Sequence, residues 1–297
     1  ADGRDARRSG HVLGDEGRVK VTFWGTRGSI AAPGPGTVTY GGDTSCVAIE
    51  GDDPSHLLIL DAGSGIRELG RTVGPEVERI DLLLSHLHLD HIVGLGFFDP
   101  LFRTDLTVAI WAPPATAPLW RRLGRYLSPP LFPVHVRELG CELELHEGLD
   151  GATRCGEFTV EGAPIVHPGF AFGYRIEHAG RRLAYLPDHE PALSPEFPRL
   201  PSWTSGYDIC RDVDLLIHDG QYGPDEYEEH VGWGHSSVLH AVALAEMAGV
   251  HELALFHHDP AHDDATVKRL TAKAQAAAAN VSVTAARQGR TLALDPH

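Results

Sequence analysis

The chain has 297 residues, of which 42% are hydrophobic and 22% are charged, and its formal net charge is −16. Such a length and composition are typical of a globular protein with one large domain or two small ones. The acidic balance argues against binding to nucleic acid or to an anionic membrane through charge alone, because that attraction depends on clustered Lys and Arg.

Two further observations concern the compartment. No apolar stretch approaches the ~20 residues that span a bilayer, and the N-terminal stretch lacks the apolar centre of a signal peptide. The cysteines show no CxxC spacing that would indicate a sulfur-bound zinc, and a disulfide framework is not expected in a chain of this size. We therefore expect a cytoplasmic protein that has no membrane partner.

Short apolar, β-branched segments alternate with turn signals along most of the chain. They follow a polar, charged segment at residues 1–17, which predicts a flexible lead-in, and residues 18–297 are expected to form a single domain. Many of these strands end at Gly, Asp or His, and α/β folds keep their sites at strand ends. The predicted strands cover residues 18–25, 45–51, 56–63, 79–86, 157–167, 171–180, 181–188, 212–220, 251–259 and 281–295.

Helices are predicted between and after these strands. A short one follows the third strand at 65–74, and a longer one near the C-terminus covers 264–279. The clearest covers 235–249, where His235 or Ser236 lies near the start, apolar residues recur at three and four, and a glycine ends the pattern. Two strand-rich halves flanked by helices predict a layered sheet sandwich and not a doubly wound sheet.

Residues 111–136 form a proline-rich segment that mixes one short helical pattern with rigid loop. We expect this segment to form a lid or a pocket wall. Its aromatic side chains would offer apolar and stacking contacts to a ligand, or serve ordinary packing. They are Trp111, Trp120, Tyr126 and Phe132.

The stretch SHLHLDH at residues 85–91 follows a predicted buried strand and has the pattern HxHxDH. On an extended segment His86 and His88 point to the same side, so they can bind one ion. Asp90 and His91 come where the chain turns into a helix and can face a second ion. Imidazole and carboxylate ligands suit Zn²⁺, and also Mn²⁺ or Fe.

Two ions need more ligands than this stretch supplies. The chain offers His167, Asp188 and His257, each at the end of a predicted strand. A single histidine or aspartate at such a place is most often a turn residue. Together with HxHxDH, these residues predict a dinuclear metal site.

The chain resembles the metallo-β-lactamase superfamily, and within it the branch of ribonuclease Z and small phosphodiesterases. The resemblance rests on the segments VTFWGTRGS, TSCVAIEG, LLILDAGSG, SHLHLDHIVGL, IVHP, LAYLPDHEP, VDLLIHDGQY, GHSS and LALFHHDP, in this order along the chain. It implies an α+β fold, the four-layer αββα sandwich of the family.

The resemblance also implies a division of the ligands. His86, His88 and His167 would bind one metal, Asp90, His91 and His257 would bind the second, and Asp188 would bridge both. His258 is the alternative to His257. In the family two zinc ions about 3.5 to 4 Å apart share a water whose pKa a metal can bring down to about 7, and this hydroxide is the nucleophile.

Other polar residues take places that the family uses near the metals. Asp90, His218, Asp219 and His235 are the expected catalytic residues. His235 would protonate the departing alkoxide, or else cap the helix that follows, and Asp219 would hold an imidazole in one orientation or make a buried strand-end hydrogen bond. Arg27 and His235 are the expected substrate contacts, although Arg27 also fits a plain turn.

These features predict a metal-dependent hydrolase, a phosphodiesterase for a small phosphodiester such as a cyclic nucleotide or a cyclic phosphate. The acidic chain lacks the basic arm of a ribonuclease Z, which disfavours long nucleic acid as a partner. A lactone, thioester or amide hydrolase, a tRNA-processing-type ribonuclease and a non-catalytic metal-holding sensor are the alternatives. Analogy with the family suggests a homodimer.

Overall fold

The computed structural model describes residues 17–198 and 200–295. The predicted flexible segment at 1–17 therefore lies outside the described residues, except for Gly17. The single-domain extent of residues 18–297 stays a prediction. None of the helices in the described part of the chain combines the length and the apolar character that crossing a bilayer requires.

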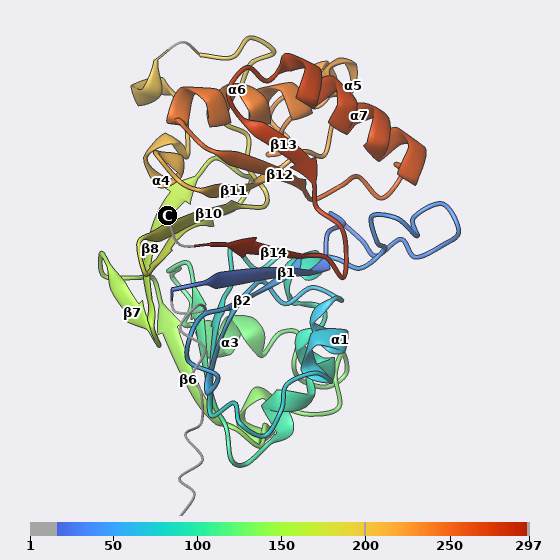
Figure 1. The fold of residues 1–297 in the computed structure, drawn as a ribbon. Helices are drawn as coiled ribbons and strands as arrows, with labels where there is room; N and C mark the ends of the chain where they lie inside the picture. Colours follow the sequence, from blue (N-terminus) through green and yellow to red (C-terminus); the bar gives the residue numbers. More distant parts are fainter. Residues whose placement is uncertain (1–16, 199, 296–297) are drawn as a thin grey trace, which may run out of the picture.

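Two seven-stranded mixed sheets pack face to face, with helices on their outer sides (Figure 1). The first sheet has the order β14 (Thr291–Leu294), β1 (Val19–Gly25), β2 (Cys46–Glu50), β3 (His56–Leu60), β4 (Arg79–Leu83), β5 (Thr107–Ala112) and β6 (Glu142–Glu147). The second has the order β13 (Ser282–Ala285), β12 (Glu252–Phe256), β11 (Leu215–Asp219), β10 (Arg181–Leu186), β9 (Ala171–His178), β8 (Phe158–Ile165) and β7 (Thr153–Cys155).

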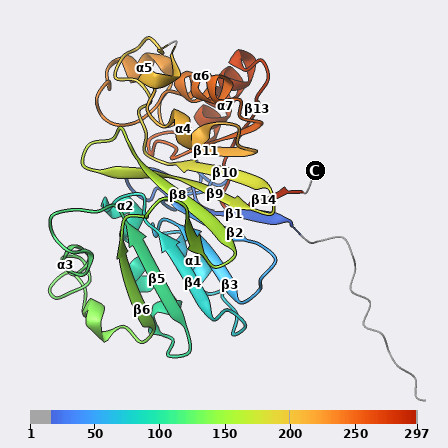
Figure 2. The same ribbon diagram turned by 90° about the vertical axis from the view of Figure 1, so that its left-hand side faces the viewer.

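The two sheets and the helices outside them form four layers (Figure 2). Three large apolar cores lie between these layers. The central core lies between the sheets and includes Phe23, Leu58, Tyr185 and Phe256, all almost fully buried. The outer cores join each sheet to its helices, because strand side chains alternate between the two faces. This arrangement confirms the predicted αββα sandwich.

The helices divide between the two outer layers. On the first sheet, α1 (Ile66–Gly70) and α3 (Leu119–Leu123) contribute to the outer core. On the second sheet, α4 (Tyr207–Cys210), α6 (Val238–Ala248) and α7 (Asp264–Ala277) do the same. The short helix α2 (Leu89–Ile92) contains two of the predicted ligands, and α5 (Pro224–Glu228) lies between β11 and α6 along the chain.

Several boundaries differ from the prediction. The cap of α6 is Ser237, whose side chain accepts a hydrogen bond from the backbone of His240, so His235 is not the cap. The helix expected after Asp90 is only the short α2, followed by a turn of 3-10 helix at Leu95–Phe97. Strands β5, β6 and β7 were not predicted. The sequence of β6 alternates charged and apolar residues at the edge of its sheet, and β7 has only three residues, so both give a weak strand pattern.

Candidate metal centre

The predicted ligands come together at one edge of the sandwich, beyond the carboxyl ends of several strands. Strands β3 to β6 run parallel to one another, as do β10 to β13. The carboxyl ends of parallel strands meet at the same edge of a sheet, so loops far apart in the chain become neighbours. The HxHxDH stretch follows β4, and the three other predicted ligands follow β8, β10 and β12.

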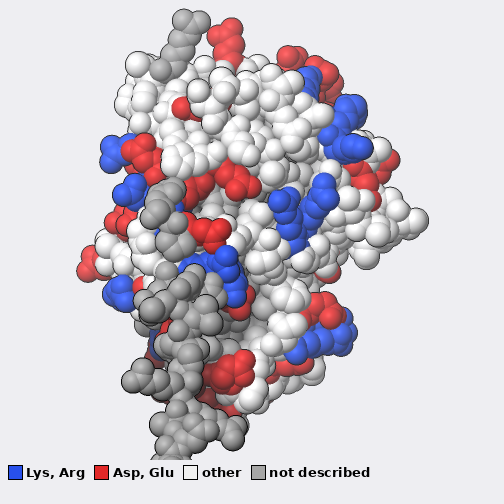
Figure 3. All heavy atoms as spheres, in the orientation of Figure 1, with Lys and Arg blue, Asp and Glu red and all other residues white. Residues whose placement is uncertain are grey.

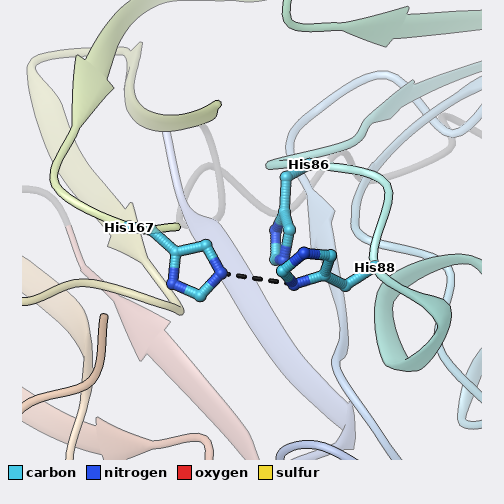
Figure 4. A group of neighbouring side chains, drawn as sticks. All are labelled: His86, His88 and His167. Atoms are coloured by element: carbon cyan, nitrogen blue, oxygen red, sulfur yellow. Dashed lines mark hydrogen bonds between the residues drawn. The ribbon is translucent and has the colours of Figure 1, made fainter. Parts of the chain in front are cut away.

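One group consists of His86, His88 and His167 (Figure 4). Figure 4 shows the three imidazole rings converging from the segments after β4 and β8. Each ring has a nitrogen within 4.8 Å of the others, and His167 Nε2 lies 3.3 Å from His88 Nδ1. This spacing allows the three nitrogens to bind one ion.

The second group consists of Asp90, His91, Asp188 and His257, whose side chains are all buried. Asp90 Oδ2 lies 3.3 Å from His91 Nε2 and 3.2 Å from His257 Nε2. The backbone N–H of Ser29 donates to the same Oδ2 over 2.7 Å, which holds the carboxylate in place. These donors can surround a second ion.

Asp188 lies between the two groups. Its Oδ1 is 2.9 Å from His91 Nε2 and 3.2 Å from His257 Nε2. Its Oδ2 is 3.8 Å from His86 Nε2 and 3.9 Å from His167 Nε2. Each oxygen of this carboxylate therefore faces one histidine group, as a bridging ligand requires.

The residues fit bound cations. His86 Nε2, His91 Nε2 and Asp188 Oδ1 are buried and make no hydrogen bond. Leaving such atoms without a partner is costly, and a metal ion would supply the missing partner. The mixture of imidazole nitrogen and carboxylate oxygen suits Zn²⁺, Mn²⁺ or Fe.

The electrostatics agree with this fit. Burial lowers the pKa of His86, which keeps its imidazole neutral, as a ligand must be. Burial also disfavours charge on His91, yet the charges of Asp188, Asp90 and Asp61 outweigh it and raise its pKa. The second group therefore favours a positive charge at its centre.

Asp61 orients His91 and was not predicted as a site residue. Its Oδ2 accepts a hydrogen bond from His91 Nδ1 over 2.7 Å, which turns Nε2 of that ring toward Asp188. Ser85 and Tyr185 also donate to this carboxylate, with Ser85 using both its N–H and its hydroxyl. The only signal in the sequence was the place of Asp61 near the end of the third predicted strand, residues 56–63.

The ring nitrogens of two other histidines are also fixed by partners. His257 Nδ1 donates to Gln221 Oε1 over 3.0 Å, and His167 Nδ1 donates to the carbonyl of Gly234 over 3.0 Å. His258 points away from the cluster, donates to the carbonyl of Ala286, and has a pKa lowered to about 3 by burial. The structure thus brings His257, and not His258, to the metal centre.

His235 and Asp219 lie beside this centre. Asp219 Oδ2 accepts from His235 Nδ1 over 2.8 Å, and its Oδ1 accepts the N–H groups of Gln221 and Ser236. The His235 ring stacks on His257 at 5.0 Å. Burial alone would lower the pKa of His235, but the charge and the hydrogen bond of Asp219 raise it to about 9.

Two predicted site residues lie elsewhere. His218 is buried and accepts at Nε2 from His189 Nδ1 over 2.8 Å, because it alternates with Asp219 on β11 and so faces the other side. Arg27 is fully buried and donates to three backbone carbonyls, those of Gly41, Asp259 and His262. The structure therefore does not bring the side chains of His218 and Arg27 into the metal centre, and their catalytic and substrate-binding roles stay predictions.

Two cavities adjoin the metal centre. The first, which we call the His235 cavity, has a volume of about 570 Å³ and includes His235, Trp233 and Glu226 in its lining. The second, about 240 Å³, includes His86 and His88. The proline-rich segment contributes to the wall of this second cavity through Pro113, Pro114, Ala115 and Arg122.

The aromatic residues of the proline-rich segment have other contacts. Trp111 donates to Asp81 and stacks on His146, and Phe132 is buried in the outer core of the first sheet. Neither they nor Trp120 and Tyr126 line the two cavities. Ordinary packing accounts for Trp111 and Phe132.

Comparison with known proteins agrees with these observations. Residues 56–258 match the family model described as "Beta-lactamase superfamily domain". The chain is 26% identical over 281 residues to a ribonuclease Z of Haloarcula marismortui, covering 80% of this chain and 86% of that protein.

Two solved structures share the fold. The metallo-β-lactamase fold protein YhfI of Bacillus subtilis aligns with a TM-score of 0.69 and 21% identity, over 94% of this chain and 100% of that one. A diphosphatase of the PhnP family aligns with a TM-score of 0.65 and 19% identity, over 94% of this chain and 98% of that one.

Proposed function

The chain belongs to the metallo-β-lactamase superfamily and is a metal-dependent hydrolase, and on this basis we propose that it is a dinuclear phosphodiesterase for a small phosphodiester. Cyclic nucleotides and cyclic phosphates are the substrates we have in mind. The observation that carries the proposal is the position of Asp188, whose two oxygens each face one histidine group.

In this proposal one metal is held by His86, His88 and His167, the other by Asp90, His91 and His257, and Asp188 is shared. Two zinc ions fit this donor set, with Mn²⁺ or Fe as alternatives. When bound, such ions activate a water and neutralise charge on the phosphate oxygens.

The chain's own residues complete the site. Because Nδ1 of His235 is bonded to Asp219, the proton that this ring can give to a departing alkoxide is the one on Nε2. His235 retains 12% exposure of its side chain and borders the His235 cavity, so it can reach a substrate there. Asp61 supports catalysis indirectly, because its hydrogen bond holds the His91 ring in the orientation of a ligand.

The surface favours a small substrate. On the face in Figure 3, Lys and Arg are interspersed with Asp and Glu and form no continuous basic surface. With a net charge of −16, the chain lacks the general electrostatic attraction that holds a long nucleic acid. Because some relatives are named ribonuclease Z, a transfer RNA precursor is the competing substrate that should be tested beside the small phosphodiesters.

The site also bears on the bond that is cleaved. A lactone, thioester or amide hydrolase could use the same metal centre. The Asp219–His235 pair favours a phosphodiester, because an alkoxide leaving from phosphorus at neutral pH needs a proton donor.

Elemental analysis combined with substrate screening tests the proposal. We expect two equivalents of transition metal per chain, and hydrolysis of cyclic nucleotides or cyclic phosphates by the metal-loaded protein. Lactones, thioesters and a transfer RNA precursor should be poor substrates. Fewer than two equivalents would contradict the dinuclear site, and faster turnover of a transfer RNA precursor or of a lactone would contradict the substrate class.

A further inference from the structure

The His235 cavity has a wall whose purpose the metal centre does not explain. The cavity extends from His235 and Gln221 at the metal centre to Trp233 and Glu226 at its outer end. Gln221 Oε1 accepts from His257, so the inner end of the cavity touches a proposed ligand directly. A ligand group in this cavity would therefore lie next to the phosphate that reacts at the metal centre.

Three aromatic rings line one side of the cavity. Tyr222 and His230 stack at 4.6 Å with an angle of 22° between their planes, and the edge of Trp233 meets His230 at 4.7 Å. Tyr222 is buried, whereas Trp233 is 61% exposed. A large indole left exposed beside a stacked pair can cover a flat aromatic ligand.

The exposed Trp233 is held in place and not merely left on a loose loop. The buried carboxylate of Glu190 accepts the N–H of Gly232 over 2.8 Å and that of Gly234 over 2.8 Å, one on each side of Trp233. It also accepts the hydroxyl of Tyr227 over 2.7 Å. The backbone on both sides of Trp233 is thereby fixed before any ligand arrives, which lowers the entropy cost of binding.

At its outer end the cavity presents the carboxylate of Glu226, whose Oε1 already accepts one hydrogen bond, from His262 Nε2 over 2.9 Å. The carboxylates of Glu226 and Asp259 belong to the lining, which includes no Lys or Arg among the described residues. One N–H of Gln221 donates to Asp259, and His230 Nδ1 donates to the carbonyl of Glu226. The carboxylate of Glu226 would repel a phosphate at this outer end, away from His235, whereas a neutral group with N–H donors would be bound.

We propose that the His235 cavity binds the base of a nucleoside cyclic phosphate, with Trp233 stacking on the base and Glu226 selecting bases that present amino and ring N–H groups. Guanine offers two such donors on one edge and suits a carboxylate best, whereas uracil presents carbonyls on both sides of its N–H. This inference rests on the proposed function and narrows its substrate class to nucleosides.

Steady-state kinetics with the metal-loaded enzyme test the stacking residue. The substrates are guanosine 3′,5′-cyclic phosphate and a base-free control, methyl riboside 3,5-cyclic phosphate. We expect Trp233→Ala to lower kcat/KM for the nucleotide by about five- to a hundredfold relative to the base-free control, as for loss of one base stack. The matched variant Trp203→Ala removes another exposed indole, 79% exposed and outside the cavity, and should change neither.

The carboxylate is tested by Glu226→Gln, which keeps an oxygen for the N–H of Gly223, removes the charge and replaces the oxygen that accepts from His262 by an amide. We expect the preference for the guanosine over the uridine cyclic phosphate to fall by about tenfold, the effect of losing one charge-assisted hydrogen bond. An unchanged preference would overturn the role of Glu226. An equal loss on nucleotide and base-free substrate in Trp233→Ala would show that the loop only positions His235, and would overturn the base site.

Calorimetric binding of guanosine, which has no phosphate, separates this inference from the proposed function. Binding that is weakened by Trp233→Ala and not by Trp203→Ala supports the base site even if no phosphodiester is cleaved. If the native enzyme cleaves the base-free substrate as well as the nucleotides and does not bind guanosine, the proposed function stands and the base site is wrong.

Discussion

Two aspartate–histidine pairs lie at the candidate metal centre, one at the bottom and one at the rim. Asp61 holds His91 at 2.7 Å, and Asp219 holds His235 at 2.8 Å, in both cases through Nδ1 of the ring. His91 has no exposed side-chain surface, whereas His235 keeps 12%. The two pairs therefore have nearly the same hydrogen bond at Nδ1 of the histidine, and they differ in what surrounds Nε2 of the same ring.

The difference teaches how one pairing can serve two purposes. Nε2 of His91 faces the carboxylates of Asp90 and Asp188, and a bound metal ion would contact all three groups at once. His235 instead borders a cavity of about 570 Å³ that a substrate can enter. Depth, and not the partner aspartate, separates the proposed ligand from the proposed proton donor.

The largest effect is expected from His235→Ala. Loss of a general acid lowers kcat by roughly 10²- to 10⁴-fold, while metal content should stay at two equivalents because His235 is not a proposed ligand. Phosphodiesterase assays and elemental analysis of the same preparation measure both quantities. The exposed His251 provides a matched His→Ala control that should keep full activity. Loss of metal from His235→Ala would instead place this residue among the ligands.

A smaller effect is expected from Asp61→Asn at the bottom of the site. Removing a partner that orients a metal ligand weakens metal affinity by roughly 10- to 100-fold, so activity should recover as zinc is added. Competition with a chelator measures the affinity, and thermal melting checks that the variant is folded. The rim variant Asp219→Asn should lower kcat with unchanged metal affinity. Equal losses of affinity in both variants would mean that depth does not distinguish the two pairs.

The smallest effect is expected at a third pair, which lies away from the metal centre and serves stability. His56 donates to Asp81 over 2.9 Å. Burial alone raises the pKa of Asp81, but hydrogen bonds from His56, Arg79 and Trp111 outweigh it and lower the pKa below the usual 3.8. The folded state therefore gains stability from Asp81 above pH 3.8, and this gain is lost as the pH falls through the folded-state pKa.

Urea unfolding of Asp81→Asn measures this contribution. At pH 7 the variant should be about 1–3 kcal/mol less stable than the native chain, with phosphodiesterase activity retained. The difference should shrink below pH 3.8, where the native carboxylate also becomes protonated. A difference that stays constant into acid would show that the charge of Asp81 does not stabilise the fold.

Much of the site could be predicted from local pattern. Strand alternation places His86 and His88 on one side of an extended segment, and the structure brings them into one group with His167. The same alternation also explains the position of His218, since neighbours on β11 face opposite sides and Asp219 is the one that faces the metal centre.

Other features depended on contacts between distant segments. Arg27 looked like a phosphate contact beside a glycine turn, yet three carbonyls from two other loops surround its guanidinium. No local pattern distinguishes these two outcomes, because burial depends on how the loops pack. Asp61 is another example, since its partners Ser85 and Tyr185 come from β-strand ends of different sheets.

The sequence by itself determined the layered α+β fold and four closely spaced residues of the metal centre, because hydrophobic periodicity and short-range spacing are local properties. These four residues are His86, His88, Asp90 and His91. Only the tertiary structure decided between His257 and His258, placed each oxygen of Asp188 toward a different histidine group, and separated His91 from His235 by depth. These outcomes depend on how two sheets pack against each other and which strand ends they bring together, and that packing is set by contacts between residues far apart in the chain.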